Sequence, residues 1–313
     1  MKKLLVILSL LGLSCNSLFA QDANFSQPYA NPLYLNPAFA GTGTNQRIGL
    51  NFRDEWPNIP GSFVTYNVSY DRNIIDSSNA IGVLGNYDEA GQATLTTTNI
   101  SIIYAHQFHI FKSFTLSFGV QGTYHEKSVN WNKLTMGDMI DATRGFVYNS
   151  QEVSTRTSIA VSDFSAGVLG YGKNYFVGFA VNHFTQPDES FVTGSSPLPI
   201  KYTFNAGYMI PIGSFMLSPT ILYEKQQDFS QEMINCYISK GHFTLGIGSR
   251  IMDAMIFTLG YQNTWMRVGY SYDLTTSALG TQTGGSHEAS LALVLPYKST
   301  KFKKVNAINC PNF

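Results

Sequence analysis

Six histidines are the first residues in this sequence to consider for chemistry. His106 and His109 lie three positions apart, close enough for both imidazoles to bind one metal ion. No third ligand follows them in the sequence, so the pair is better explained as polar residues of an interfacial turn. The other histidines, expected to be hydrated near strand ends, are His125, His183, His242 and His287.

Motifs for covalent catalysis and nucleotide binding are missing. No serine occupies a nucleophile elbow, and no glycine-rich phosphate loop precedes a helix. We therefore expect no enzyme activity and no cofactor. An enzyme stays open as an alternative, because catalytic residues from separate strands could converge without leaving a motif.

Charged side chains are a stronger signal, because several lie on the polar face of predicted strands. They are Arg47, Arg53, Asp71, Arg267, Asp273 and Glu288. If the strands form a barrel, these side chains point into its lumen. There they either form ordinary ion pairs, or they hold a plug or line a path.

The strands themselves are read from alternation. Between Phe114 and Tyr124, apolar residues occupy one parity and Ser, Thr and Gln the other, over a length that crosses a bilayer as a tilted strand. About fourteen such segments are predicted, at 47–53, 64–71, 80–87, 95–106, 114–124, 162–171, 175–182, 201–210, 215–224, 232–239, 243–249, 254–261, 266–273 and 287–295.

Composition favours a membrane barrel over a secreted β-sandwich, which would also alternate. Charged residues make up only 13% and aromatic residues 14% of the chain. A sandwich needs more charge on its solvated surface, whereas lipid covers the apolar face of a barrel. The predicted fold is an all-β, antiparallel, transmembrane outer-membrane barrel.

The N-terminus predicts a signal peptide at 1–20, with Lys2 and Lys3 before the apolar stretch 4–13 and a cleavage site after Ala20. Cys15 allows a lipoprotein alternative, but Gly12 stands where Leu is usual. Cleavage removes two of the 20 basic residues and none of the 20 acidic ones, for a net charge of −2. No nucleic-acid partner is expected from that balance.

Loop lengths predict the topology. If the first strand runs outward, the three longest connections (125–161, 183–199 and 274–286) fall outside, and the periplasmic turns are short. Both termini are then periplasmic. Trp131 and Phe146 in the 125–161 loop are candidates for partner binding. So are Trp56 in the Pro-stiffened loop 54–61 and Arg53, which precedes that loop.

The segment before the first strand has neither the pattern of a signal peptide nor that of a β-strand. Two Asn-Pro pairs, Asn31-Pro32 and Asn36-Pro37, enclose Leu33-Tyr34-Leu35, and Phe39 follows. Because proline lacks a donor and disfavours helix in the preceding residue, we expect a rigid extended strap. The candidate partner-binding residues in the strap are Asn31, Pro32, Tyr34, Asn36, Pro37 and Phe39. The alternative is a plain lead-in to the first strand.

The predicted organisation is therefore a signal at 1–20, a periplasmic or lumenal strap at 21–45, a barrel at 46–295 and a basic periplasmic tail at 296–313. Cys236 should face lipid and Cys310 lies in the tail, so a disulfide between them is not expected. Some fourteen strands enclose a lumen too wide for side chains alone to fill. Water, folded-in loops or another polypeptide must occupy it.

Three motifs carry a family resemblance. Phe25-Ser-Gln27 followed by Asn31-Pro-Leu-Tyr-Leu-Asn-Pro-Ala-Phe-Ala-Gly41 resembles the start of the PorP/SprF family. Arg53-Asp-Glu-Trp-Pro57 resembles its first hairpin. The ending Lys303–Phe313 resembles that of SprF-like members, although Asn312 stands where Arg is frequent.

The resemblance implies an outer-membrane barrel of the type IX secretion system of Bacteroidota. It implies a role in export or surface attachment of a cargo protein, notably a gliding adhesin with a type B C-terminal domain. The implied partners are outer-membrane lipid, that cargo, and periplasmic secretion or peptidoglycan-binding components. The alternative function is a passive or substrate-specific channel.

Overall fold

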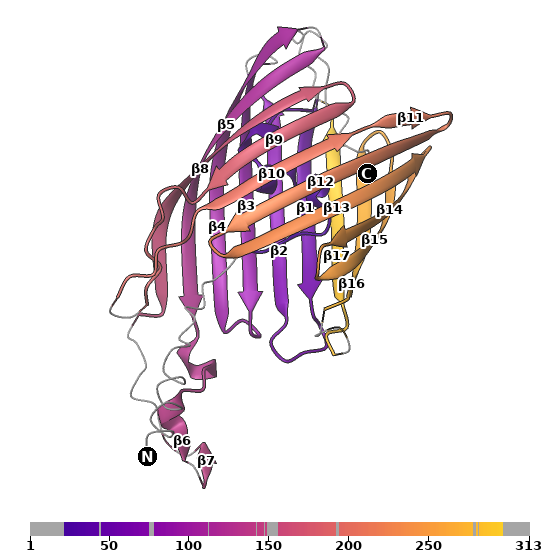
Figure 1. Ribbon diagram of the computed structural model, residues 1–313. Helices are drawn as coiled ribbons and strands as arrows, with labels where there is room; N and C mark the ends of the chain where they lie inside the picture. Colours follow the sequence, from indigo (N-terminus) through magenta and orange to yellow (C-terminus); the bar gives the residue numbers. More distant parts are fainter. Residues whose placement is uncertain are drawn as a thin grey trace, which may run out of the picture.

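The computed structural model describes residues 22–296, except 44, 75–77, 112, 142, 147, 149–155, 192–193, 278–279 and 281. These residues form a closed antiparallel barrel, in which β1 pairs with β17 and β10 pairs with β12 (Figure 1). The barrel strands are β1 (Gln46–Glu55), β2 (Phe63–Asn73), β3 (Asn79–Ala90), β4 (Leu95–Phe111), β5 (Phe114–Val129), β8 (Ser158–Gly172), β9 (Tyr175–Asn182), β10 (Lys201–Tyr208), β11 (Ile210–Ile212), β12 (Phe215–Gln226), β13 (Phe229–Lys240), β14 (Phe243–Arg250), β15 (Ala254–Gln262), β16 (Met266–Thr275) and β17 (Ser286–Leu295).

Strand β11 continues the path of β10 after an interruption at Met209, since both pair with β12. The barrel therefore has fourteen spanning strands, and the predicted fold class is confirmed. The predicted signal peptide and basic tail lie outside the described residues, apart from Pro296.

The two faces of each strand differ as the alternation predicts. On β5, Thr115 and Ser117 are buried in the lumen, whereas Phe118 and Val120 are 47% and 56% exposed on the outside. In a bilayer this outer apolar face lies against hydrocarbon, while the closed ladder satisfies the backbone. Within the described part of the chain, no helix is both long and apolar enough to cross a membrane.

The two ends of the barrel differ in their connections. The long-loop end carries 56–62, 130–157, 183–200 and 276–285, and the short-turn end carries two-residue turns such as 173–174 and 241–242. The 130–157 connection holds η3 (Trp131–Lys133), η4 (Gly137–Met139) and the hairpin β6 (Ile140–Asp141)–β7 (Gly145–Phe146), which projects past the end of the barrel (Figure 1). This loop is shorter than the expected 125–161, because β5 and β8 keep pairing as far as Ser128 and Ser158.

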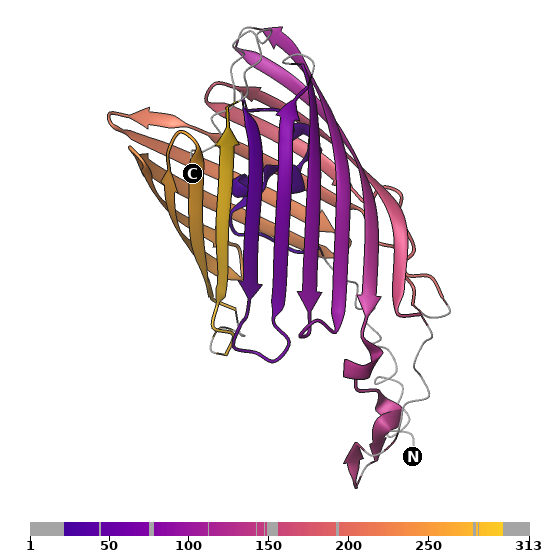
Figure 2. The ribbon, with the colours of Figure 1, turned by 180° about the vertical axis from the view of Figure 1, so that it is seen from behind.

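Residues 22–43, the strap, lie inside the barrel and not alongside it (Figure 2). The expected extended geometry is wrong, since the strap folds into η1 (Pro28–Ala30), α2 (Pro32–Leu35) and η2 (Pro37–Phe39). Each turn begins with a proline, whose fixed φ suits the first position of a helix and whose missing donor would be unpaired there anyway. The same prolines that argue against a long helix therefore start three short ones.

Candidate functional site

The strap crosses the lumen from one end to the other. Asp22 contacts His183, which follows β9 at the long-loop end. The backbone N–H of Gly41 donates to Asp71 at 2.8 Å, near the short-turn end of β2. The chain then enters β1 from that same end, at Gln46. The strap thus occupies the lumen along its length and leaves part of it open.

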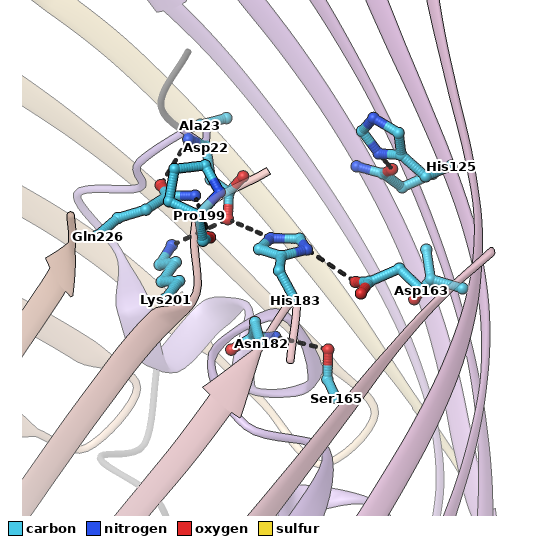
Figure 3. A network of polar contacts seen from close by, with 12 residues as sticks. Asp22, Ala23, His125, Asp163, Ser165, Asn182, His183, Pro199, Lys201 and Gln226 are labelled. Atoms are coloured by element: carbon cyan, nitrogen blue, oxygen red, sulfur yellow. Dashed lines mark hydrogen bonds and ion pairs between the residues drawn. The ribbon is translucent and has the colours of Figure 1, made fainter. Parts of the chain in front are cut away.

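An ionic network fixes the start of the strap (Figure 3). The Asp22 carboxylate lies 2.9 Å from His183 Nε2 and 3.8 Å from Lys201 Nζ. The other ring nitrogen of His183 lies 2.7 Å from Asp163, which belongs to β8. Lys201 also pairs with Glu224 at 2.9 Å. The strap therefore supplies one carboxylate to a network whose other members come from the barrel and the 183–200 loop.

The protonation of this network follows from its charges. Burial by itself would lower the pKa of His183, but Asp22 and Asp163 outweigh burial and raise the pKa to about 10. Burial would likewise raise the pKa of Asp22, and the positive charges of His183 and Lys201 reverse this and lower it. Asp22 and His183 are therefore an ion pair at neutral pH.

A second anchor lies four residues further along the strap. The backbone N–H groups of Ser26 and Gln27 donate to the two carboxylate oxygens of Glu288, at 2.6 and 3.1 Å. The Ser26 hydroxyl donates to Asp273 at 2.5 Å, and the Arg53 guanidinium contacts that hydroxyl and Asp273 at 2.6 and 3.0 Å. All five residues are almost completely buried. Loss of one member would leave another buried charge unpaired, so this cluster fixes the position of the strap against β1, β16 and β17.

The second Asn-Pro pair forms a corner against the opposite wall. The side-chain amide of Asn36 donates to the backbone carbonyls of Val168 and Phe179, at 3.1 and 3.2 Å. Glycines create the space for it: a Cβ at Gly119 would lie 2.4 Å from the Ala38 nitrogen, and one at Gly167 would clash with the Asn36 side chain. The wall is therefore shaped to receive this corner.

The end of the strap combines polar and apolar contacts. Ser117 donates to the Ala38 carbonyl at 2.8 Å, and Gln107 donates to the Ala40 carbonyl at 3.3 Å. Leu33 and Phe39 lie in an apolar cluster with residues of β3, β4, β8 and β9. This cluster gives the strap a hydrophobic attachment that a solvated lead-in would lack.

A chamber of about 470 Å³ remains open above the strap at the long-loop end. Its floor includes Asp22, Asn24 and Tyr34, and its rim includes Trp56 and Phe63. The two rim rings pack edge to face, with centroids 5.9 Å apart. A second lumenal cavity, lined by Asp163 and His183 among others, is much smaller, at about 40 Å³.

The structure divides the predicted binding residues into three groups. The strap residues are inside the barrel, where Asn31, Asn36 and Phe39 are fully buried and Tyr34 reaches the chamber. Trp56 is at the chamber rim, and Trp131 packs against Phe191 in the outer loops. For Phe146, only its place in β7 is described. A partner can therefore reach the loop residues but not most of the strap.

The predicted lumenal charges face the interior. Arg47 pairs with Asp71 at 2.9 Å, and Arg53, Asp273 and Glu288 form the Ser26 anchor. Arg267 lies on the same lumen-facing parity of β16 as Asp273. Arg53, Asp71, Asp273 and Glu288 contact the strap directly, as expected if the lumenal charges hold a plug. His106 and His109 bond separately, to Asn79 and Thr115.

Sequence reasoning missed the residues that receive the strap. From the sequence, His183 is expected to be hydrated near a strand end, and Lys201, Gly119 and Gly167 lie in predicted strands without an assigned role. Their roles depend on which wall the strap approaches, and no local pattern encodes that. Only the segment that contains Asn36-Pro37 carries a sequence signal, because it is rich in proline and too apolar for a solvated linker.

Comparison with known proteins gives one family match and several similar solved structures. A family model described as "Type IX secretion system membrane protein PorP/SprF" matches residues 17–293. No curated protein matches the sequence.

Similar solved structures include a FadL homologue of Pseudomonas aeruginosa, 13% identical, covering 92% of this chain and 97% of that one, with a TM-score of 0.45. The toluene transporter TbuX of Ralstonia pickettii is 10% identical, covering 85% and 93%, with a TM-score of 0.49. The outer membrane protein Omp33 of Acinetobacter baumannii is 6% identical, covering 82% and 100%, with a TM-score of 0.44.

Proposed function

This outer-membrane β-barrel belongs to the PorP/SprF family of type IX secretion system membrane proteins, and we propose that it is a plugged, non-enzymatic barrel that exports or anchors a surface cargo protein. The cargo is proposed to be an adhesin with a type B C-terminal domain, engaged at the long-loop end, which faces the cell exterior. Periplasmic secretion or peptidoglycan-binding components would meet the opposite end.

The observation that carries this proposal is the strap inside the lumen. It is held by ionic contacts at Asp22, by the buried cluster at Ser26 and by the Asn36 corner. A passive channel needs a continuous lumen, whereas this lumen contains a folded segment of the same chain. A barrel that holds another protein needs only a rigid wall and an accessible binding surface.

The binding surface is supplied by the long-loop end. Trp56 and Phe63 at the chamber rim, and Trp131 in the outer loops, present aromatic groups of the kind enriched at protein interfaces. Short turns at the other end offer no comparable surface within the described residues. We therefore place cargo recognition on the loops and the chamber below them.

Deletion of the gene tests the function. Surface proteins of the deletion strain are compared with those of the parent and of a strain complemented with the wild-type gene. The expected result is selective loss of one large adhesin from the surface, restored by complementation. An unchanged set of surface proteins, with normal adhesion and gliding, would contradict the proposal.

A further inference from the structure

We propose that the chamber at the long-loop end binds a segment of an exported polypeptide that carries a lysine or arginine side chain, with Asp88 as the carboxylate that receives it. The inference rests on the proposed function, because it takes the long-loop end as the side from which cargo approaches. It adds the chemistry of recognition, which the family does not specify.

The charges of the chamber are unbalanced. Five carboxylates line it, and three of them already have cationic partners: Asp22 with His183, Glu189 with Lys127 and Asp253 with Arg250. Glu55 lies 3.4 Å from Arg53, a guanidinium that also contacts two other acids.

Asp88 differs from these four acids. Its carboxylate accepts a hydrogen bond from the Thr65 hydroxyl at 2.6 Å, and in the described part of the chain no cation lies within salt-bridge distance of it. Asp88 is half-buried in the chamber wall, so solvent screens its charge only in part. A cation that entered the chamber would complete this site.

Two buried amides supply a second, independent observation. Asn86 and Gln231 each line the chamber and are about 5% exposed, and the Nδ2 of Asn86 and the Nε2 of Gln231 have no hydrogen-bond partner. Buried polar groups are normally paired, so unpaired donors mark a place for acceptors. Backbone carbonyl oxygens of a peptide are acceptors of this kind.

The positions of these groups suit a chain that enters along the barrel axis. Asn86 precedes Asp88 by two residues on β3, so both side chains face the lumen side by side. Gln231 lies on β13, which is on the other side of the closed ring of strands. A peptide in the centre can therefore place a cationic side chain toward β3 and carbonyl groups toward both walls.

The apolar lining narrows the choice of ligand. Phe63, Leu95, Leu198 and Phe229 line the chamber beside its polar groups. A polyamine has the cation but no carbonyl acceptors for the two amides, and a sugar lacks the cation. A short peptide segment with apolar neighbours around one basic residue offers all three chemistries.

The described C-terminal end of the chain lies away from the chamber. Strand β17 ends at Leu295, at the short-turn end, and the strap lies in the lumen between that end and the chamber. The proposed segment belongs to another polypeptide, which enters through the long loops.

Fluorescence anisotropy with the full chain in detergent micelles tests the site. The probe is fluorophore-labelled acetyl-Ala-Phe-Lys-Phe-Ala-amide, and its match carries norleucine in place of lysine. We expect the lysine peptide to bind at least about tenfold more tightly, because a partly buried ion pair forms only with it. Binding of neither peptide, or equal binding of both, would overturn the inference.

Variants connect the result to Asp88. Asp88→Asn should abolish the preference for the lysine peptide, whereas Glu89→Gln should keep it, because Glu89 is the next residue and points to the opposite face of β3. Gln231→Ala should weaken both peptides about equally. An unchanged preference in Asp88→Asn, with heat-modifiable migration proving a folded barrel, would overturn the assignment of Asp88.

The failure of this inference differs from failure of the proposed function. In native membranes, Asp88→Asn is expected to lose a surface protein that the wild-type barrel retains. If both barrels retain it equally, the chamber inference is wrong and the proposed function stands. If the wild-type barrel retains no surface protein, the proposed function itself is contradicted.

Competition with spermidine separates a peptide site from a polyamine site. Displacement of the lysine peptide by equal amounts of spermidine would assign the chamber to polyamines and overturn the peptide proposal.

Discussion

At the scale of single residues, charged and polar contacts hold the strap, and glycines in the wall leave space for it. Asp22, Ser26 and Asn36 each present a polar group to partners on a different part of the wall. Gly119 and Gly167 leave the space in which Asn36-Pro37 fits. Each kind of contact predicts a different experimental signature, one steric and one dependent on pH.

The steric prediction concerns Gly119. In Gly119→Ala, the new Cβ would lie 2.4 Å from the backbone of Pro37 and Ala38, which cannot move aside as a side chain can. We expect the strap to be destabilised by about 1–3 kcal/mol, as in overpacked cores. Limited proteolysis should then cleave within 22–43 faster than in wild type.

The control is Gly122→Ala on the same strand. There an added Cβ meets only the Phe164 ring, at 3.7 Å on the outer face. Its proteolysis rate should match wild type. If Gly119→Ala also matches wild type, the corner is not closely packed against β5.

The pH prediction concerns His183 and Asp22. His183 has its pKa raised from 6.5 to about 10, so its stabilising contribution is complete below pH 6.5 and is lost as pH rises toward 10. Asp22 has its pKa lowered below 3.8, so its contribution is present above pH 3.8 and is lost on further acidification. Attachment of the strap should therefore be strongest between about pH 4 and 6.5.

Proteolysis of the strap measured from pH 6 to pH 10 checks this. Wild type should become more sensitive with rising pH. His183→Asn should be sensitive at pH 6 and change little above it. His242→Gln, at the short-turn end, should keep the wild-type profile. A wild-type rate that is constant across this range would show that the ion pair does not hold the strap.

At the scale of elements, the strands were predictable and the strap was not. Alternation along 114–124 fixes which parity of β5 faces lipid, because the period of two is local to the strand. The strap has no such period, and its short turns form against a wall built from β3, β4, β5 and β8. Proline chemistry allowed either extended chain or helix starts, and packing decided between them.

The candidate site could be predicted only in part for the same reason. Trp56 and the lumenal charges were recognisable from loop position and strand parity. Asp88 and Gln231 share the lumen-facing parity with dozens of other polar residues, and their place beside the chamber depends on where the strap ends. Information of that kind lies in the three-dimensional path of the chain.

The element-scale prediction replaces both Asn-Pro pairs, Asn31-Pro32 and Asn36-Pro37, with Gly-Ser. The barrel ladder does not involve these residues, so heat-modifiable migration should show a folded barrel. The strap loses its proline-started turns and its Asn36 bonds, so cargo display at the surface should fall. Surface labelling of the cargo measures this.

Replacement of Pro211 by Ser is the control, since Pro211 lies in β11 near the short-turn end, away from the long loops and the chamber. It changes a proline without changing the strap. Normal display in the Asn-Pro variant would reduce the strap to a lead-in that happens to lie inside the barrel.

At the scale of the whole molecule, the barrel is a rigid wall whose lumen contains the strap and whose one end carries the long loops. The wall buries polar side chains inward and presents apolar side chains to lipid. The strap occupies the lumen between the ends, and the long loops with the chamber form the accessible surface. Under the proposed function, this division separates sealing of the membrane from recognition of a partner.

Ion conductance measures whether the strap closes the lumen to ions. In planar bilayers the wild-type barrel should show no steady conductance, because the strap is anchored along the length of the lumen. The Gly-Ser variant of both Asn-Pro pairs should open transiently or permanently. Steady conductance of the wild type, equal to that of the variant, would favour the channel alternative.

Purification of the wild-type barrel from its native outer membrane tests the central claim most directly. The account predicts that a surface adhesin with a type B C-terminal domain accompanies the barrel in a fixed ratio after mild detergent extraction. A barrel recovered alone, and conducting ions in bilayers, would contradict it.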